Sequence, residues 1–176
     1  GMYQLKTSAT KKTDIVLLGS GAILREVEAA AVLLQQDFGI GADIWSATSF
    51  TELKRDAERT AHNNMHNITN KPKSSYVADS LAYHAGPVVA ATDYIRSYAE
   101  QIRPYIKNDY HVLGTDGFGR SDTREKLRKH FEVDSFSIAY TAIYSLFAAN
   151  KLSLDQLKKA YKMYKVDADK TYSLDS

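Results

Sequence analysis

The chain has 176 residues, no cysteine and a formal net charge of +2, with 44% hydrophobic and 25% charged residues. This length and composition are typical of one globular domain. The lack of cysteine excludes disulfides, thiolate catalysis and cysteine-ligated zinc, and it is compatible with the cytoplasm, which is the location we expect. Lys and Arg are spread along the chain and no apolar run reaches the roughly 20 residues that cross a bilayer, so neither nucleic acid nor a membrane is an expected partner.

Apolar residues alternate between short continuous runs and longer stretches with helical spacing. The short runs predict strands buried on both faces, at 14–18, 42–48, 88–91 and 110–113, and residues 2–5 predict a short edge strand. The longer stretches predict helices that begin near residues 22, 49, 76, 93, 121, 136 and 153. Residues 62–74 are rich in Asn and contain Pro72, which predicts a loop.

Short polar side chains precede most of these helices and predict their first residues. Ser49 with Glu52 matches a capping box, and Asp93 is expected to cap a helix that runs to about Tyr105. Ser121 or Asp122 is expected to cap the next helix. Asp134 and Ser153 are expected to cap the last two helices.

The alternation of strands and helices predicts an α/β fold with three layers, αβα. The sheet is expected to have five strands, mostly parallel and joined by right-handed crossovers, with residues 2–5 as an antiparallel edge. We predict one domain over residues 1–176. Gly1 is interpreted as a remnant of a cleaved tag, and the polar residues 167–176 as a tail that frays.

One loop is a candidate functional segment because it follows a predicted parallel strand, where ligand crevices form. It consists of Gly114, Thr115, Asp116, Gly117, Phe118, Gly119, Arg120, Ser121 and Asp122. Its charged residues can bind or polarise a substrate. The loop can equally be a structural one, held by hydrogen bonds of its own Asp and Ser side chains.

A second, weaker candidate is the turn Gly19, Ser20 and Gly21, which joins a predicted strand to a helix and can present N–H groups to an anion. A dinucleotide-binding motif needs a further glycine where Leu24 stands, so that motif is not met. We favour a tight turn that requires small residues. His62 and His66 are spaced as two ligands on a helix, but we interpret them as exposed, because two ligands alone are a weak metal pattern.

Several segments resemble the C-terminal domain of the homodimeric pyruvate dehydrogenase decarboxylase component. They lie at residues 17–25, 48–53, 92–94, 113–122 and 130–134, and the longest contains Gly-Thr-Asp-Gly-Phe-Gly-Arg-Ser-Asp. The Gly-Phe-Gly turn is also similar to the corresponding turn of transketolases. The resemblance implies the fold of the transketolase C-terminal domain.

The resemblance also implies a parent oxidoreductase of a multienzyme complex downstream of glycolysis. That enzyme decarboxylates pyruvate on thiamine diphosphate with magnesium and acetylates a lipoyl group. The family's cofactor site lies on the two preceding domains, so no catalytic, cofactor-binding or metal residue is assigned here. This chain is expected to be inactive alone, to serve dimer assembly and to shape the mouth of the active-site channel. Its expected partners are those domains and a second subunit.

Two other functions stay open. The chain can be a free-standing module that holds an anion between the Gly19 turn and the Gly114 loop. It can also dock the lipoyl acyltransferase component through the basic last helix, around Lys158, Lys159 and Lys162.

Overall fold

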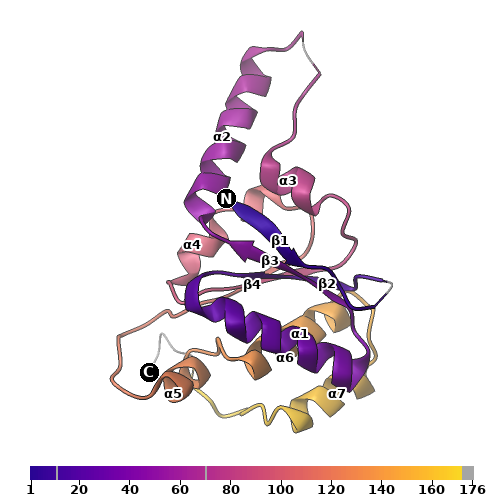
Figure 1. Ribbon diagram of the computed structural model, residues 1–176, viewed down its shortest axis with the longest axis vertical. Coiled ribbons are helices and arrows are strands. Elements are labelled where there is room, and N and C mark those ends of the chain that lie inside the picture. Colours follow the sequence, from indigo (N-terminus) through magenta and orange to yellow (C-terminus); the bar gives the residue numbers. More distant parts are fainter. Residues whose placement is uncertain (11, 70, 172–176) are drawn as a thin grey trace.

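Five strands form one sheet in the computed structural model, which describes residues 1–10, 12–69 and 71–171 (Figure 1). They are β1 (Met2–Lys6), β2 (Ile15–Gly19), β3 (Ala42–Ala47), β4 (Val88–Ala91) and β5 (Tyr110–Leu113), in the spatial order β1-β3-β2-β4-β5. Strands β3, β2, β4 and β5 run parallel, and β1 pairs antiparallel with β3. The predicted sheet and its antiparallel edge are therefore confirmed.

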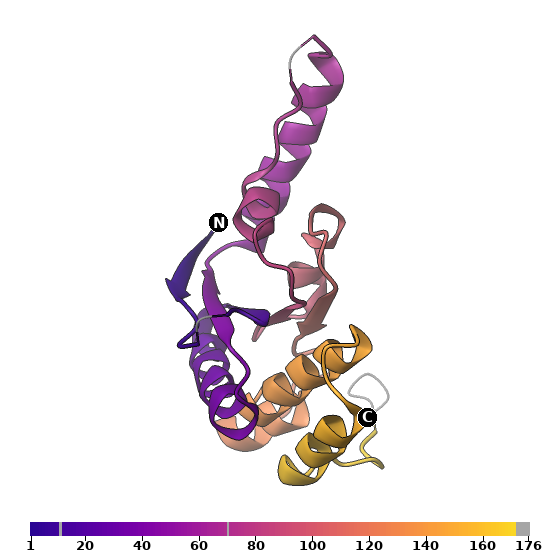
Figure 2. The same cartoon turned by 90° about the vertical axis from the view of Figure 1, so that its right-hand side faces the viewer.

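Helices cover both faces of this sheet (Figures 1 and 2). One face carries α1 (Leu24–Phe38), α5 (Arg124–His130), α6 (Ser135–Ala148) and α7 (Leu154–Met163); the other carries α2 (Phe50–His66), α3 (Tyr76–Leu81) and α4 (Arg96–Glu100). Two short 3-10 turns lie at Gly21–Ile23 and Arg103–Tyr105. Among the described residues, no helix has both the length and the apolar character that a membrane span requires.

Strand β2 shows why the continuous apolar runs become central strands. Ile15 and Leu17 face the core formed with α1, α6 and α7, whereas Val16 and Leu18 face the core formed with α2, α3 and α4. All four side chains are fully buried. Because side chains alternate between the two faces of a sheet, a strand covered on both sides must be apolar at every position.

Helix α2 and the chain that returns from it project beyond the sheet as a finger (Figures 1 and 2). The loop predicted from residue 62 was wrong over its first part, because α2 continues to His66. Asn64 donates to the Lys73 carbonyl at 2.8 Å and accepts from the Lys73 N–H at 2.9 Å. These bonds tie the last turns of α2 to the returning chain, where there is little apolar packing.

One predicted capping box and two predicted helix starts need correction. Ser49 accepts from the Glu52 N–H, but the Glu52 carboxylate pairs with Arg55, so only half of the capping box forms. Thr123, rather than Ser121 or Asp122, caps α5.

The third correction concerns Asp93, which does not cap a helix. Helix α4 begins only at Arg96 and ends at Glu100, and the predicted single helix to Tyr105 is split by a 3-10 turn that contains Pro104. Proline lacks the N–H that a continuing α-helix needs.

The caps at Asp134 and Ser153 are confirmed. Asp134 accepts from the Ser137 N–H at 2.8 Å. Ser153 and Gln156 form a complete capping box at the start of α7.

Beyond α7, Lys170 donates to the Lys129 carbonyl at 2.6 Å, which brings this part of the predicted tail against the end of α5. Residues 172–176 of that tail lie outside the described residues.

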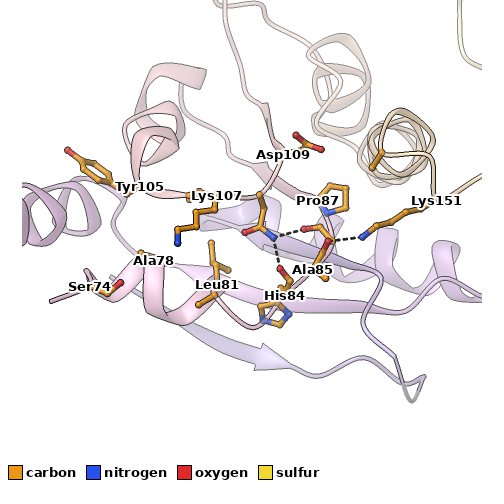
Figure 3. Close-up of a pocket in the computed structure, with 15 residues that line it drawn as sticks. Ser74, Ala78, Leu81, His84, Ala85, Pro87, Tyr105, Lys107, Asp109 and Lys151 are labelled. Atoms are coloured by element: carbon orange, nitrogen blue, oxygen red, sulfur yellow. Dashed lines mark hydrogen bonds between the residues drawn. The ribbon is translucent and has the colours of Figure 1, made fainter. Parts of the chain in front are cut away.

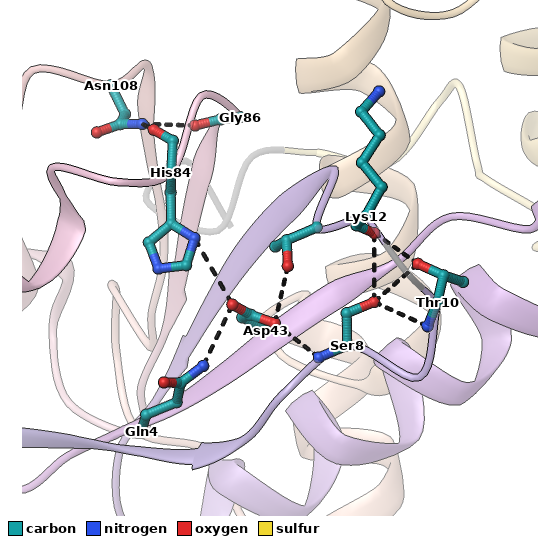
Figure 4. Close-up of polar contacts among 9 residues, drawn as sticks. Gln4, Ser8, Thr10, Lys12, Asp43, His84, Gly86 and Asn108 are labelled. Carbon is teal, nitrogen blue, oxygen red and sulfur yellow. Dashed lines mark hydrogen bonds and ion pairs between the residues drawn. The ribbon is translucent and has the colours of Figure 1, made fainter.

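Asp43 is a buried carboxylate that joins four segments at the amino-terminal side of the sheet (Figure 4). It accepts from the Ser8 N–H at 2.6 Å, from the Thr13 hydroxyl at 3.0 Å and from the Gln4 amide at 3.2 Å. His84 Nδ1 lies 3.6 Å from its second oxygen. Several donors around one carboxylate satisfy a group that is costly to bury without partners.

Replacing Asp43 with Asn should therefore lower the free energy of unfolding by about 1–3 kcal/mol, because an amide retains one acceptor oxygen and turns a donor toward donors. Urea unfolding measures this change. Asp109→Asn is the matched control, since that side chain is exposed and makes no hydrogen bond with any described residue. Equal losses in the two variants would contradict the assignment.

The imidazole of His111 in β5 gives a pH prediction. Burial lowers its pKa from the ordinary value of 6.5, and the Asp109 carboxylate offsets only part of the effect. The unfolded chain therefore binds more protons than the folded chain as pH falls through 6.5, so stability decreases on acidification in this window. When the pH is lowered from about 7.5 to 5.5, we expect the melting temperature of the His111→Gln variant to fall less than that of the parent chain. Parallel melting curves against pH would refute this role.

Candidate functional site

The carboxyl ends of β2, β4 and β5 meet at one edge of the sheet. From β2 the chain passes through α1 to β3 on one side, and it later returns to β4 on the other side of β2. Such a reversal of strand order leaves a crevice at the carboxyl ends of the two neighbouring strands. Both sequence candidates, the Gly19 turn and the Gly114 loop, start at this edge.

The first residues of the Gly114 loop are held by hydrogen bonds to the chain that follows β4. The Thr115 N–H donates to the Tyr94 carbonyl at 2.9 Å, and the Thr115 hydroxyl donates to the Asp93 carbonyl at 2.8 Å. Asp116 accepts from the Arg96 N–H at 2.8 Å and lies 3.3 Å from Arg96 Nε. Asp116 thus satisfies the first N–H of α4, so its carboxylate has a structural use.

The Gly19 turn is a close-packed connection. The Ser20 N–H donates to the Ala91 carbonyl at 3.1 Å, so it is not available to an anion. The buried Ser20 and Thr92 hydroxyls are hydrogen-bonded to each other at 2.8 Å. A Cβ at Gly19 would lie 2.9 Å from the Leu24 backbone, and Gly21 has φ +55°. These features support the interpretation as a tight turn that requires small residues.

A cavity of about 370 Å³ opens at this edge and brings residues of both candidates together. Ala22 and Ile23 follow the Gly19 turn, and Asp93 follows β4. The Gly114 loop contributes Thr115, Gly117, Gly119 and Arg120, and α5 with the chain after it contributes Arg124, Leu127, Arg128, Phe131 and Val133. Of the other loop residues, Ser121 and Asp122 line an adjoining surface hollow, and Phe118 is 85% exposed.

The charges of the cavity are unequally neutralised. Arg128 Nη1 lies 2.6 Å from Glu26 Oε1, and the other Glu26 oxygen accepts from the Ser135 N–H. The side chains of Arg120 and Arg124 are exposed, and neither makes a hydrogen bond or ion pair with any residue that the structure describes. Burial lowers the pKa of His130, and the nearby cations Arg120 and Lys170 lower it further.

Sequence reasoning identified Arg120 but missed Arg124, Arg128 and Asp93 as lining residues. Arg120, Arg124 and Arg128 recur every four residues, which is the spacing of one helix face. That spacing was the available signal, although Arg120 lies before α5 begins.

A second cavity, of about 390 Å³, lies at the amino ends of β4 and β5 (Figure 3). Several of its polar groups are already engaged. The Asn108 amide donates to the carbonyls of His84 and Gly86, and Lys151 Nζ donates to the Ala85 carbonyl at 2.7 Å. This cavity is therefore a weaker candidate for a ligand.

The remaining sequence candidates have local roles. The rings of His62 and His66 stack at 4.1 Å near the end of α2, and no group of three His, Cys, Asp or Glu side chains suited to a metal occurs among the described residues. In α7, Lys159 donates to the Asp37 carbonyl and lies over the Phe38 ring, so it packs within the chain. Tyr164 donates to Asp37 Oδ2 at 3.0 Å.

The sequence and the fold both match a known family. Residues 1–134 match the transketolase-like C-terminal domain family. The chain belongs to this family. Solved transketolases share the fold: those of Campylobacter jejuni and Pichia stipitis give TM-scores of 0.56 at 16% and 17% identity, over 82% and 88% of this chain and 18% and 20% of theirs.

Several relatives match nearly the whole length of the chain. It is 46% identical to a pyruvate dehydrogenase E1 component of Cupriavidus necator over 97% of the chain, and 48% identical to one of Pseudomonas aeruginosa over 99%. The Escherichia coli protein is 44% identical. The chain spans 19% or 20% of the length of these relatives. The resemblance inferred from the motifs is confirmed.

Two glycines of the Gly114 loop give a matched pair of variants for testing how tightly the connections after β4 and β5 pack in this transketolase-like C-terminal domain. A Cβ at Gly114 would lie 2.8 Å from the Tyr94 carbonyl oxygen, whereas a Cβ at Gly119 meets nothing within 4 Å. We expect Gly114→Ala to cost about 1–3 kcal/mol in urea unfolding, because the β4 and β5 connections must separate. Gly119→Ala should change stability by less than about 1 kcal/mol. A Gly114→Ala variant as stable as the parent would show that the loops are not tightly joined.

Proposed function

We propose that this chain is the C-terminal domain of a thiamine-diphosphate-dependent pyruvate dehydrogenase, which decarboxylates pyruvate and acetylates a lipoyl group. The observation that carries the proposal is identity of 44–48% with pyruvate dehydrogenase E1 components across 97–99% of the chain. The transketolase neighbours support only the fold, because their identity is low.

Within the parent enzyme we assign this domain a non-catalytic role in dimer assembly and in shaping the active-site channel. Thiamine diphosphate and magnesium belong to the preceding domains in this proposal, and the whole enzyme works in the cytoplasm. The engagement of Asp116 with Arg96 supports the role, since the most suggestive carboxylate of the candidate loop is used to hold the fold.

Exposed apolar side chains supply surfaces for such contacts. Met65 and Ile68, near the end of the α2 finger, are 67% and 86% exposed. Phe118 and Tyr94 are exposed beside the carboxyl ends of the strands. Exposed apolar groups that cluster on a surface commonly mark contacts with other domains or subunits.

Docking of the acyltransferase through α7 has less support. Of the three lysines expected to form the docking surface, Lys159 packs against the end of α1. Lys158 and Lys162 are exposed, as lysines on a solvated helix face ordinarily are.

Deleting this domain from the full-length enzyme should abolish the dimer and pyruvate turnover, measured by analytical ultracentrifugation and by lipoyl acetylation. The isolated chain should unfold cooperatively and give no saturable heat with thiamine diphosphate and magnesium in calorimetry. An unchanged dimer with full turnover after deletion would overturn the role, and micromolar binding by the isolated chain would relocate the cofactor site.

The α2 finger allows a finer version of this test in the full-length enzyme. Met65→Ser combined with Ile68→Ser should weaken assembly while leaving the unfolding of the isolated chain unchanged, because both side chains are already exposed. Val32→Ser is the matched control, since Val32 is 50% exposed on α1 at the opposite face of the sheet.

A further inference from the structure

We propose that the cavity at the carboxyl ends of β2, β4 and β5 is a binding site for a small molecule with an oxyanion joined to an apolar body, such as a phosphate monoester. This inference concerns the chain's own cavity and does not depend on which enzyme carries the domain.

The position of the cavity is the first argument. The chain adds β3 on one side of β2 and then adds β4 and β5 on the other side, so the order of strand addition reverses between β2 and β4. The cavity is lined by residues that follow these two strands and β5. Open parallel sheets bind ligands in the crevice at such a reversal. Its volume of about 370 Å³ is within the range of sites for small organic molecules.

The second argument is the charge of the lining. Arg120 and Arg124 line the cavity, and no described residue forms an ion pair or hydrogen bond with either side chain. Two of the nearby acidic groups are already committed: Glu26 to Arg128, and Asp122 to Lys126 at 3.5 Å. Two guanidinium groups that line one cavity suit an oxyanion, because each can donate two parallel hydrogen bonds to it.

Arg128 is held in place differently from the other two arginines. Its bond to Glu26 fixes the guanidinium against the start of α1, and Glu26 is fixed in turn by the Ser135 N–H at the start of α6. The cavity therefore contains one cation, Arg128, that is neutralised by Glu26, and two cations, Arg120 and Arg124, whose side chains pair with no described carboxylate.

The remaining lining sets the rest of the ligand. Ile23, Leu127, Phe131 and Val133 form an apolar wall, which favours a ligand with a hydrocarbon or aromatic part. Asp93 is the one carboxylate among the lining residues that the structure describes. It favours a ligand whose oxyanion binds Arg120 and Arg124 and whose other end carries a hydroxyl or amine donor.

Phenyl phosphate is a suitable first probe, with benzoate, phenol and inorganic phosphate as comparison compounds. Titration of the ¹⁵N-labelled 176-residue chain should give saturable shifts at Gly117, Gly119 and the Arg120 and Arg124 side-chain N–H groups. We expect a dissociation constant of about 0.1–1 mM, with phenol and inorganic phosphate each binding more weakly because each lacks half of the recognised chemistry. Benzoate distinguishes carboxylates from phosphate esters as the preferred class.

Arg120→Gln combined with Arg124→Gln should weaken phenyl phosphate binding at least about tenfold. Lys158→Gln combined with Lys162→Gln removes the same net charge from exposed positions on α7 and should leave binding unchanged. Arg124→Gln alone replaces the first variant in the comparison if the double substitution impairs folding.

Three outcomes would overturn the proposal. They are shifts scattered over surface lysines, equal weakening in the two double variants, and no saturation by about 10 mM phenyl phosphate.

Discussion

The whole arrangement depends on the burial of β2 on both of its faces. Its four apolar side chains divide between two cores, so helices must cover the sheet above and below. A sheet covered on both faces exposes only its edges and strand ends, and polar loops collect there. The strand ends are therefore where this fold can present chemistry, and the carboxyl end carries the arginine-lined cavity.

Hydrogen bonding at that end separates residues that hold the fold from residues that face solvent. Ser20, Thr92, Thr115 and Asp116 are engaged with neighbouring strand connections. The loop is thus fixed at its first residues, and Arg120 is carried on its later part. Both interpretations of the Gly114 loop therefore have support: Thr115 and Asp116 hold neighbouring connections, and Thr115, Gly117, Gly119 and Arg120 line the cavity.

The sequence predicted the central strands β2 and β4 well because each lies in a short continuous apolar run. It failed where a distant residue decides the outcome. Asp93 has the chemistry of a cap, but Asp116, on the connection after β5, takes the first N–H of α4. Helix α2 outlasts its apolar spacing because Asn64 bonds to Lys73. The cavity could be predicted only in part, since Arg124 and Arg128 meet Ile23 and Asp93 through the packing of α5 beside α1.

The finger also divides the chain into two halves. Strands β1, β2 and β3 come before it, and β4 and β5 come after it, yet the halves join along the β2–β4 ladder and through α1 against α6. These contacts lie outside the finger. The connection from α2 to α3 can thus vary in length, accept inserted sequence or be nicked without breaking a strand pair. In this sense the domain consists of two consecutive segments of the chain that pack together as two subunits of a complex do.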